Sequence, residues 1–295
     1  MACAAAAPAQ ADTFYATSSF NNVRLLTLDP DTGQVLTSLD VTGEEALFGG
    51  LTVAEDGLYS IDGYNDGQSD RTFRIDPDTG EGTVVGNTGE NWNFRCVETD
   101  PISGKLYATR DNALYTLDRD TGAATLVAPI QGSTLDQTTA IAIRGDGAAF
   151  IVDIGDTGLY SLNLQTGAAT HLGNLRPGVR EWYQDLAFDG FDRLWGILNG
   201  GGLYIIDIEN VSDELKFATP FYRGIAFGDL AGRCSYTLKK VKAKRCDSCP
   251  RQGDEFRTEE VCEDVKECRK KVKTQIPCPE GDGKCKLKAK ERRCG

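Results

Sequence analysis

The sequence predicts an all-β fold, a five-bladed β-propeller followed by a small cysteine-rich module, and three observations lead to this prediction. A segment at 114–125, Leu-Tyr-Thr-Leu-Asp-Arg-Asp-Thr-Gly-Ala-Ala-Thr, recurs closely at 159–170 and more loosely at 73–83 and 25–34. A second pattern begins at residues 50, 95, 140 and 185, always 45 apart, and again at 224. Glycine is abundant, with 33 residues in 295, which suits many short strands joined by turns.

Each copy of the first segment predicts a β-hairpin. Alternating apolar and polar residues over four to eight positions favour a strand. Between the two strands an aspartate can bond its own backbone, and a glycine accepts the positive φ of a tight turn. We therefore expect Asp29-Pro30-Asp31 and Asp76-Pro77-Asp78 to form hairpin turns. A period of about 40–45 residues with four strands per repeat is typical of a propeller.

The second pattern supplies the innermost strand of each blade. In Arg95-Cys96-Val97-Glu98 the apolar second position aligns Cys96 with Leu51, Ile141, Leu186 and Ile225, which predicts a buried core thiol. The same alignment makes Arg95 and Asp185 equivalent residues at the channel mouth, where they would meet across the channel or bind a polar ligand.

The fifth copy, 224–227, is followed by no further strands of its own. Three strands at the other end of the chain, 13–17, 24–28 and 35–39, can complete its blade. Pairing the first and last strands removes exposed sheet edges. We therefore predict a closed ring of five blades, with six as the alternative count if two blades have been merged.

The chain divides into three predicted parts. Residues 1–11 are rich in alanine and end Ala9-Gln10-Ala11, which predicts a secretory signal or a disordered tail. The propeller is expected over 12–232 and the cysteine-rich module over 233–295. No apolar run approaches the roughly 20 residues that a membrane span needs. These features together favour a secreted, extracellular protein.

Charge separates the two larger parts. From Cys234 onward there are 18 Lys/Arg and 11 Asp/Glu, whereas the preceding residues carry 14 Lys/Arg and 33 Asp/Glu. An acidic body joined to a basic appendage suggests partners of opposite charge. The overall acidity and the lack of a known binding motif argue against nucleic acid.

The terminal module has few hydrophobic residues and an even number of cysteines, so four disulfides are the expected source of its stability. Their pairing cannot be deduced. Zinc is the alternative suggested by Cys246-Asp247-Ser248-Cys249, although the module has no histidine. The predicted disulfide cysteines are Cys234, Cys246, Cys249, Cys262, Cys268, Cys278, Cys285 and Cys294.

Alternating basic and apolar residues at 241–245 and 285–290 predict strands with one positive face. Such a face suits an acidic polysaccharide, another extracellular protein or the acidic propeller of a second copy, which would give self-association. The alternative interpretation is an ordinary solvated surface.

Candidate ligand-binding residues lie in the loops that lead into the innermost strands. Aromatic rings there could stack on a sugar, and charged groups could contact its hydroxyls, although aromatic residues that pack between blades would look the same. The candidates for the channel and its rim are Trp92, Arg95, Trp182, Tyr183, Asp185 and Arg223.

One further loop gathers oxygen ligands that would suit Ca²⁺. Its candidates are Asp62, Asn65, Asp66 and Asp70, whose spacing does not match an EF-hand. Ordinary turn chemistry explains the same residues. No other cofactor is indicated.

The Leu-Tyr-x-Leu/Ile-Asp-x-x-Thr-Gly pattern resembles the repeats of secreted bacterial β-propellers related to WD-repeat and quinoprotein-like propellers, over roughly residues 12–232. The Gly-His and Trp-Asp signatures of WD repeats are absent, as is the regular tryptophan motif of quinoproteins. The resemblance therefore implies a fold rather than a function. We predict a non-catalytic binding or assembly protein with the module as anchor or cross-linker. The alternatives are a carbohydrate-active enzyme acting through channel carboxylates such as Asp185, or a lectin-like propeller.

Overall fold

The computed structural model describes two units, each considered by itself. Residues 11–228 form one unit, and residues 1–10 and 229–295 form the other. Within them the structure describes residues 13–18, 23–43, 48–62, 69–91, 93–132, 135–155, 157–179 and 181–228, together with the backbone of four strands between 233 and 294.

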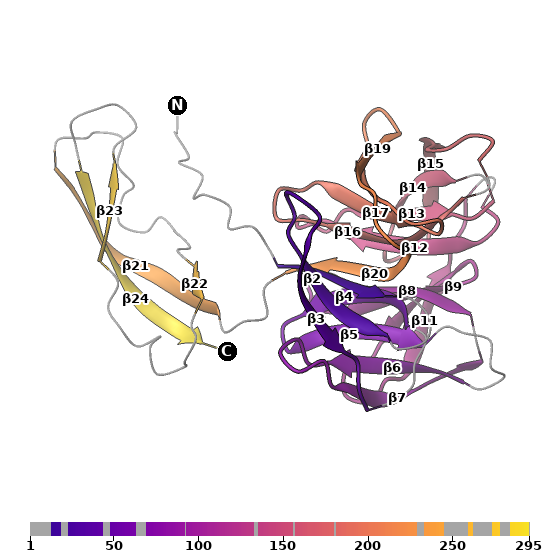
Figure 1. The fold of residues 1–295 in the computed structure, drawn as a ribbon, viewed down its shortest axis with the longest axis horizontal. Coiled ribbons are helices and arrows are strands. Elements are labelled where there is room, and N and C mark those ends of the chain that lie inside the picture. The colour runs from indigo at the N-terminus through magenta and orange to yellow at the C-terminus, as the bar shows by residue number, and fades with distance from the viewer. Residues whose placement is uncertain are drawn as a thin grey trace. The chain divides into compact units, whose positions relative to one another are not determined.

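The first unit is a β-propeller of five four-stranded antiparallel blades (Figure 1), as predicted. Its strands, from the axis outward, are as follows. Blade I contains β20 (Tyr222–Phe227), β1 (Phe14–Ser18), β2 (Arg24–Leu28) and β3 (Val35–Asp40); blade II contains β4 (Phe48–Ala54), β5 (Gly57–Asp62), β6 (Ser69–Ile75) and β7 (Gly82–Asn91); blade III contains β8 (Phe94–Thr99), β9 (Leu106–Arg110), β10 (Ala113–Leu117) and β11 (Ala124–Pro129); blade IV contains β12 (Thr138–Ile143), β13 (Ala149–Asp153), β14 (Gly158–Leu162) and β15 (Ala169–Asn174); blade V contains β16 (Tyr183–Phe188), β17 (Leu194–Leu198), β18 (Leu203–Asp207) and β19 (Ser212–Phe217).

The ring closes through blade I, which combines strands from both ends of the propeller. β20 pairs with β1, and this register places Phe14 opposite Phe227 and Ala16 opposite Ile225. The predicted closure is therefore confirmed. Because β1 hydrogen-bonds to β20, the first and last strands protect one another's edges.

The hairpin turns are also confirmed, and their sequence explains them. Asp76 Oδ1 accepts hydrogen bonds from the backbone N–H of Asp78 and of Thr79, each at 2.9 Å. Asp29 makes the same pair of bonds to Asp31 and Thr32. Gly80 then adopts a φ of +75°, a conformation that side chains with a Cβ seldom adopt.

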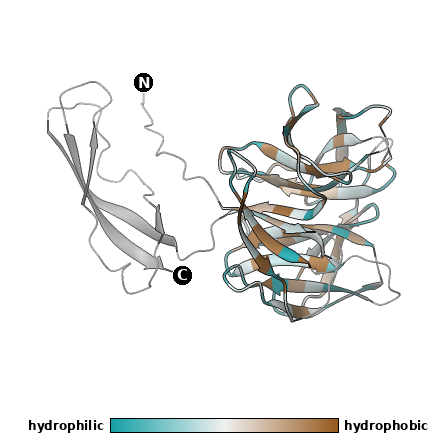
Figure 2. Ribbon diagram, in the orientation of Figure 1, coloured by the Kyte–Doolittle hydropathy of each residue, from teal (hydrophilic) through white to brown (hydrophobic). Residues whose placement is uncertain are grey.

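The core lies between neighbouring blades rather than at one centre. Leu114 and Cys96 of blade III pack with Ile141 and Tyr160 of blade IV, and comparable clusters join other neighbours. Figure 2 shows hydrophobic stretches along the propeller strands. Apolar burial of this kind holds adjacent blades together.

The strand register corrects one sequence alignment. Val97, not Cys96, is the equivalent of Leu51 and Leu186. Val97 pairs with Ala108, the third residue of β9, and Leu186 pairs with Gly196, the third residue of β17. Cys96 is thus the equivalent of Asp185, and Arg95 lies one residue earlier, at a β-bulge. Cysteine and valine are both apolar, so the hydrophobic pattern fits two frames and only strand pairing selects one. The prediction of a buried thiol is nevertheless confirmed, since Cys96 is fully buried and free.

The second unit is described only as backbone. Its sheet has the order β22 (Glu259–Val261), β21 (Arg233–Lys244), β24 (Lys284–Cys294) and β23 (Lys273–Pro277). Cys234 and Cys294 are Cα partners in the β21–β24 register. The side chains of the eight module cysteines lie outside the described residues, as do residues 1–11, so the disulfides and the signal segment remain predictions.

Candidate functional site

The propeller has two faces, which its antiparallel blades define. The turns between the first and second strands of a blade and those between its third and fourth strands lie at one end, which we call the turn face. The loops that lead into the innermost strands lie at the opposite end, the loop face. An ion pair between Arg119 of one such turn and Asp56 of another, at 3.1 Å, shows that turns of adjacent blades meet on the turn face.

On the loop face, Arg95 belongs to a polar network between blades III and IV. Its Nη2 donates to Gln137 Oε1 at 3.3 Å, and Gln137 Nε2 donates to Asp111 Oδ1 at 3.2 Å. Burial lowers the pKa of Arg95, and the nearby Asp111 charge partly opposes this shift. Its Nε is buried and has no hydrogen-bond partner among the described residues. The neighbour of Arg95 is therefore an amide, and Asp185 is not its ion-pair partner.

The aromatic candidates on the loop face separate into different surroundings. Tyr183 is only 1% exposed, and its hydroxyl donates to Asp213, which also accepts from Arg176 Nε at 2.6 Å. Burial and the Asp213 carboxylate raise the pKa of Tyr183. Its ring is therefore packed inside the protein rather than open for a sugar.

Trp182 is partly exposed, and its buried Nε1 has no hydrogen-bond partner among the described residues. Arg223 lies over the Phe221 ring, 5.6 Å from its centroid. Trp92 lies outside the described residues. Of the predicted stacking residues, Tyr183 is thus buried and Trp182 is partly exposed, and the stacking platform stays a prediction.

Asp185 lies near the propeller axis and is fully buried. Its Oδ2 accepts from Leu51 N at 3.0 Å on β4 and from Ile225 N at 2.9 Å on β20. An innermost strand leaves one row of backbone groups without a neighbouring strand, and a buried N–H without a partner is costly. One carboxylate thus joins three blades.

The residues equivalent to Asp185 are small, namely Gly50, Cys96, Ala140 and Gly224. A Cβ on Gly50 would lie 3.0 Å from Cys96 Cα and 3.2 Å from Asp185 Oδ1. The inner strands therefore approach closely across the axis at this level. Because the equivalent residues of the other four blades are small, the Asp185 side chain has room to lie between the inner strands.

Burial raises the pKa of Asp185 well above its usual range, although its backbone hydrogen bonds oppose this shift. Its Oδ1 is buried without a partner among the described residues. Glu98 also has a raised pKa, first because of burial and second because of the Asp185 charge. Thr52 Oγ1 donates to Glu98 Oε1 at 3.3 Å. Asp185 is thus a sealed structural carboxyl that does not reach solvent, so this geometry gives it no access to a substrate.

The predicted calcium ligands are only partly described. Asp62 Oδ2 pairs with Arg71 Nη2 at 2.8 Å, and Asp70 Oδ2 accepts from Phe94 N at 2.9 Å. Asn65 and Asp66 lie outside the described residues. In the part of the chain that is described, Asp62 and Asp70 thus serve an ion pair and a backbone contact.

The turn face is strongly acidic. The basic residues of its inter-strand segments are Lys105, Arg119, Arg144 and Arg193, and each arginine pairs with an acid of the same face. Arg74, near the end of β6, also pairs with Asp56 of this face, at 3.9 Å. The inter-strand segments of this face carry the following acidic residues: Asp29, Asp31, Glu55, Asp56, Asp76, Asp78, Glu81, Asp100, Asp118, Asp120, Asp146, Asp189, Asp192 and Glu209.

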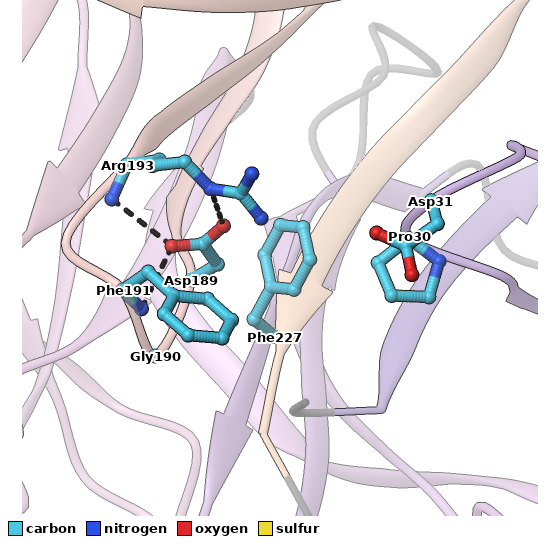
Figure 3. Close-up of a pocket in the computed structure, with 7 residues that line it drawn as sticks. All are labelled: Pro30, Asp31, Asp189, Gly190, Phe191, Arg193 and Phe227. Atoms are coloured by element: carbon cyan, nitrogen blue, oxygen red, sulfur yellow. Dashed lines mark hydrogen bonds and ion pairs between the residues drawn. The ribbon is translucent and has the colours of Figure 1, made fainter. Parts of the chain in front are cut away.

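A pocket opens on the turn face where blades V and I meet (Figure 3). It is lined by Pro30 and Asp31 from the β2–β3 turn, by 189–191 and Arg193 from the β16–β17 turn, and by Phe227. Sequence reasoning assigned these residues only to turns and strands. The acidic Asp-x-Asp turns were visible in the sequence, but their convergence with Phe227 depends on ring closure.

Comparisons with known proteins add little. No family model and no curated protein matches the chain. A solved structure described as a nidogen/laminin complex contains a similar chain, with 16% identity and a TM-score of 0.47, covering 74% of this chain and 98% of that one. Such a slight likeness carries no functional argument. Within the described residues there is no helix that is long and apolar enough to cross a membrane.

Proposed function

We propose that this chain is a non-catalytic, extracellular binding protein whose propeller captures a basic partner protein on the turn face. The observation that carries the proposal is the excess of acidic over basic residues on that face, where the arginines are already paired. Clustered charge of one sign steers an oppositely charged partner and raises its association rate.

The rigidity of the turns supports this role. Asp29, Asp76 and Asp118 each hold two backbone N–H groups, and these hydrogen bonds lower their pKa values. The carboxylates therefore remain ionised well into the acid range. A charged surface fixed on short turns loses little conformational freedom on binding.

The basic module, 233–295, provides a second attachment in this proposal. Its excess of Lys/Arg suits an acidic polysaccharide or another acidic extracellular surface. The chain would then hold a basic partner by its propeller and an acidic matrix by its module.

Two measurements test the proposal. Binding of a lysine-rich protein to the full chain should weaken strongly as salt is raised. A double Asp78→Asn, Asp120→Asn variant should weaken this binding, while Asp136→Asn on the loop face should not. Equal binding by all variants would remove the turn face from the proposal.

A chain truncated after residue 232 tests the module separately. It should unfold at the same temperature as the propeller of the full chain and keep its affinity for the basic protein. It should lose retention on an acidic polysaccharide resin. Unchanged retention would show that the module is not the anchor.

A further inference from the structure

The pocket between blades V and I has one wall whose polar groups already bond to one another. Asp189 Oδ2 accepts from Arg193 Nε at 2.7 Å and from Trp195 Nε1 at 2.8 Å. Its Oδ1 accepts from the backbone N–H of Phe191 at 2.9 Å and of Arg193 at 3.0 Å. Asp189 balances the Arg193 charge and has both of its oxygens occupied, so this wall offers a ligand no free carboxylate acceptor.

The Phe227 ring provides an apolar surface to the pocket, and core aromatic rings pack against it and fix its position. It stacks on Phe14 with 4.2 Å between ring centroids, and Trp195 lies 5.5 Å away. At the rim, Phe191 leaves 54% of its surface exposed. In Figure 3 the Phe227 ring lies between the two turns. A long alkyl chain could bury apolar surface against these rings without displacing a core residue.

The opposite rim carries an available charge. Asp29 uses its Oδ1 to close the turn, whereas the neighbouring Asp31 contributes its backbone N–H to that turn and leaves its carboxylate for other contacts. No basic side chain of the described residues forms an ion pair with Asp31. An apolar ligand would desolvate this carboxylate without compensation, and an acidic ligand would be repelled.

We infer that this pocket receives the side chain of one lysine or arginine from the basic partner protein. The alkyl stem would lie on Phe227 and Phe191, and the cation would reach Asp31. Basic residues combine such a stem with a charged tip. The inference rests on the proposed function, because it names the point on the turn face where the partner is held most specifically.

The experiment uses the full chain and three synthetic peptides that alternate one residue type with serine. The first contains lysine, the second norleucine, which keeps the stem but not the charge, and the third diaminobutyric acid, which keeps the charge on a stem two carbons shorter. Affinity is measured by fluorescence anisotropy at low ionic strength. Asp31→Asn is compared with Asp78→Asn, which alters the same turn position in blade II but not the pocket.

The lysine peptide should bind most tightly. Asp31→Asn should weaken it by about threefold to fivefold, the range of a partly screened ion pair. Asp78→Asn should have less effect, and Phe191→Ser should weaken the lysine peptide more than the short-stemmed one. Unchanged thermal unfolding of each variant confirms that the fold is intact.

Four outcomes would overturn the inference. Equal losses in Asp31→Asn and Asp78→Asn would show general attraction to the acidic face, which leaves the proposed function standing. Equal affinity for the lysine and short-stemmed peptides would also show general attraction to the acidic face, and the proposed function would still stand. Self-association of the full chain that Asp31→Asn abolishes in sedimentation would assign the pocket to a second copy. If no basic peptide or protein binds, the proposed function fails as well.

Discussion

Asp185 at the propeller axis and Asp76 on the turn face make the same hydrogen bonds in opposite surroundings. Each uses one carboxylate oxygen to accept two backbone N–H groups at 2.9–3.0 Å. The pKa of Asp76 is nevertheless lowered, mainly by its bond from Thr79, whereas burial raises that of Asp185. Two backbone donors are therefore enough to favour the charged form in solvent, but not to offset the loss of water at the axis.

The carboxyl groups of the propeller therefore have two different roles. The axial one joins strands from three blades and is hidden from any partner. The turn carboxylates stay charged at the surface and form the acidic face. Four substitutions test this division of roles.

Replacing Asp185 by alanine should cause the largest loss. It leaves the buried N–H groups of Leu51 and Ile225 without their acceptor and opens a cavity between the inner strands. We expect the free energy of unfolding to fall by about 3–5 kcal/mol. Urea denaturation followed by tryptophan fluorescence would measure it. If Asp185→Ala lowers the free energy of unfolding by less than Asp76→Ala on an exposed turn, Asp185 does not join the blades.

Gly50→Ala tests how closely the inner strands approach. The new methyl group would press on backbone atoms at 3.0 Å, including Cys96 Cα, which cannot move as a flexible side chain can. We expect a loss of about 1–3 kcal/mol in unfolding free energy. Gly145→Ala is the matched control, because the nearest atom to its Cβ would be 3.9 Å away. Similar losses in both would contradict a crowded axis.

Asp185→Asn tests the raised pKa of the axial carboxyl. The amide oxygen can still accept both N–H groups, but the variant cannot ionise in the unfolded state. The pKa of Asp185 is raised in the folded state. Its contribution to the free energy of unfolding is therefore complete below about pH 4 and decreases as the pH rises toward the pKa of the folded state. The asparagine variant should therefore gain stability relative to wild type between acid and neutral pH. A constant difference across this range would contradict the shift.

Asp76→Ala should have the smallest effect. The lost turn bonds face solvent, so the free energy of unfolding should fall by about 0.5–1 kcal/mol. Because the folded pKa of Asp76 is lowered, its contribution is present above about pH 4 and disappears as the pH falls through the folded value. Asp78→Ala, which keeps the Asp76 bonds, is the control. The difference between the two variants should vanish in acid.

The sequence predicted the blades because their signals are local. A turn such as Asp76 to Gly80 depends on one aspartate and one glycine, and it forms as predicted. The missing strands after 224–227 also indicated the closure between Phe14 and Phe227, because an incomplete blade has one obvious complement.

The candidate site was less predictable because its residues are brought together across the ring. The alignment of Arg95 with Asp185 was wrong by one residue, because Cys96 and Val97 are both apolar and the hydrophobic pattern fits two frames. Nothing local indicated that Asp185 would reach Leu51, which is 134 positions away in the chain. Tyr183 looked like a rim residue, although packing beside Asp213 buries it.

Residue patterns and simple counts were enough to predict the repeated hairpins, the closing strands and the separation of an acidic body from a basic module, whereas the structure settled the blade count at five rather than six. These predicted features follow from patterns within a few residues or from simple counts. The tertiary structure alone decided that one aspartate is sealed at the axis and that Asp31 shares a pocket with Phe227. Burial and proximity between blades are properties of the closed ring, and they set both the pKa of a carboxyl group and the surface it presents.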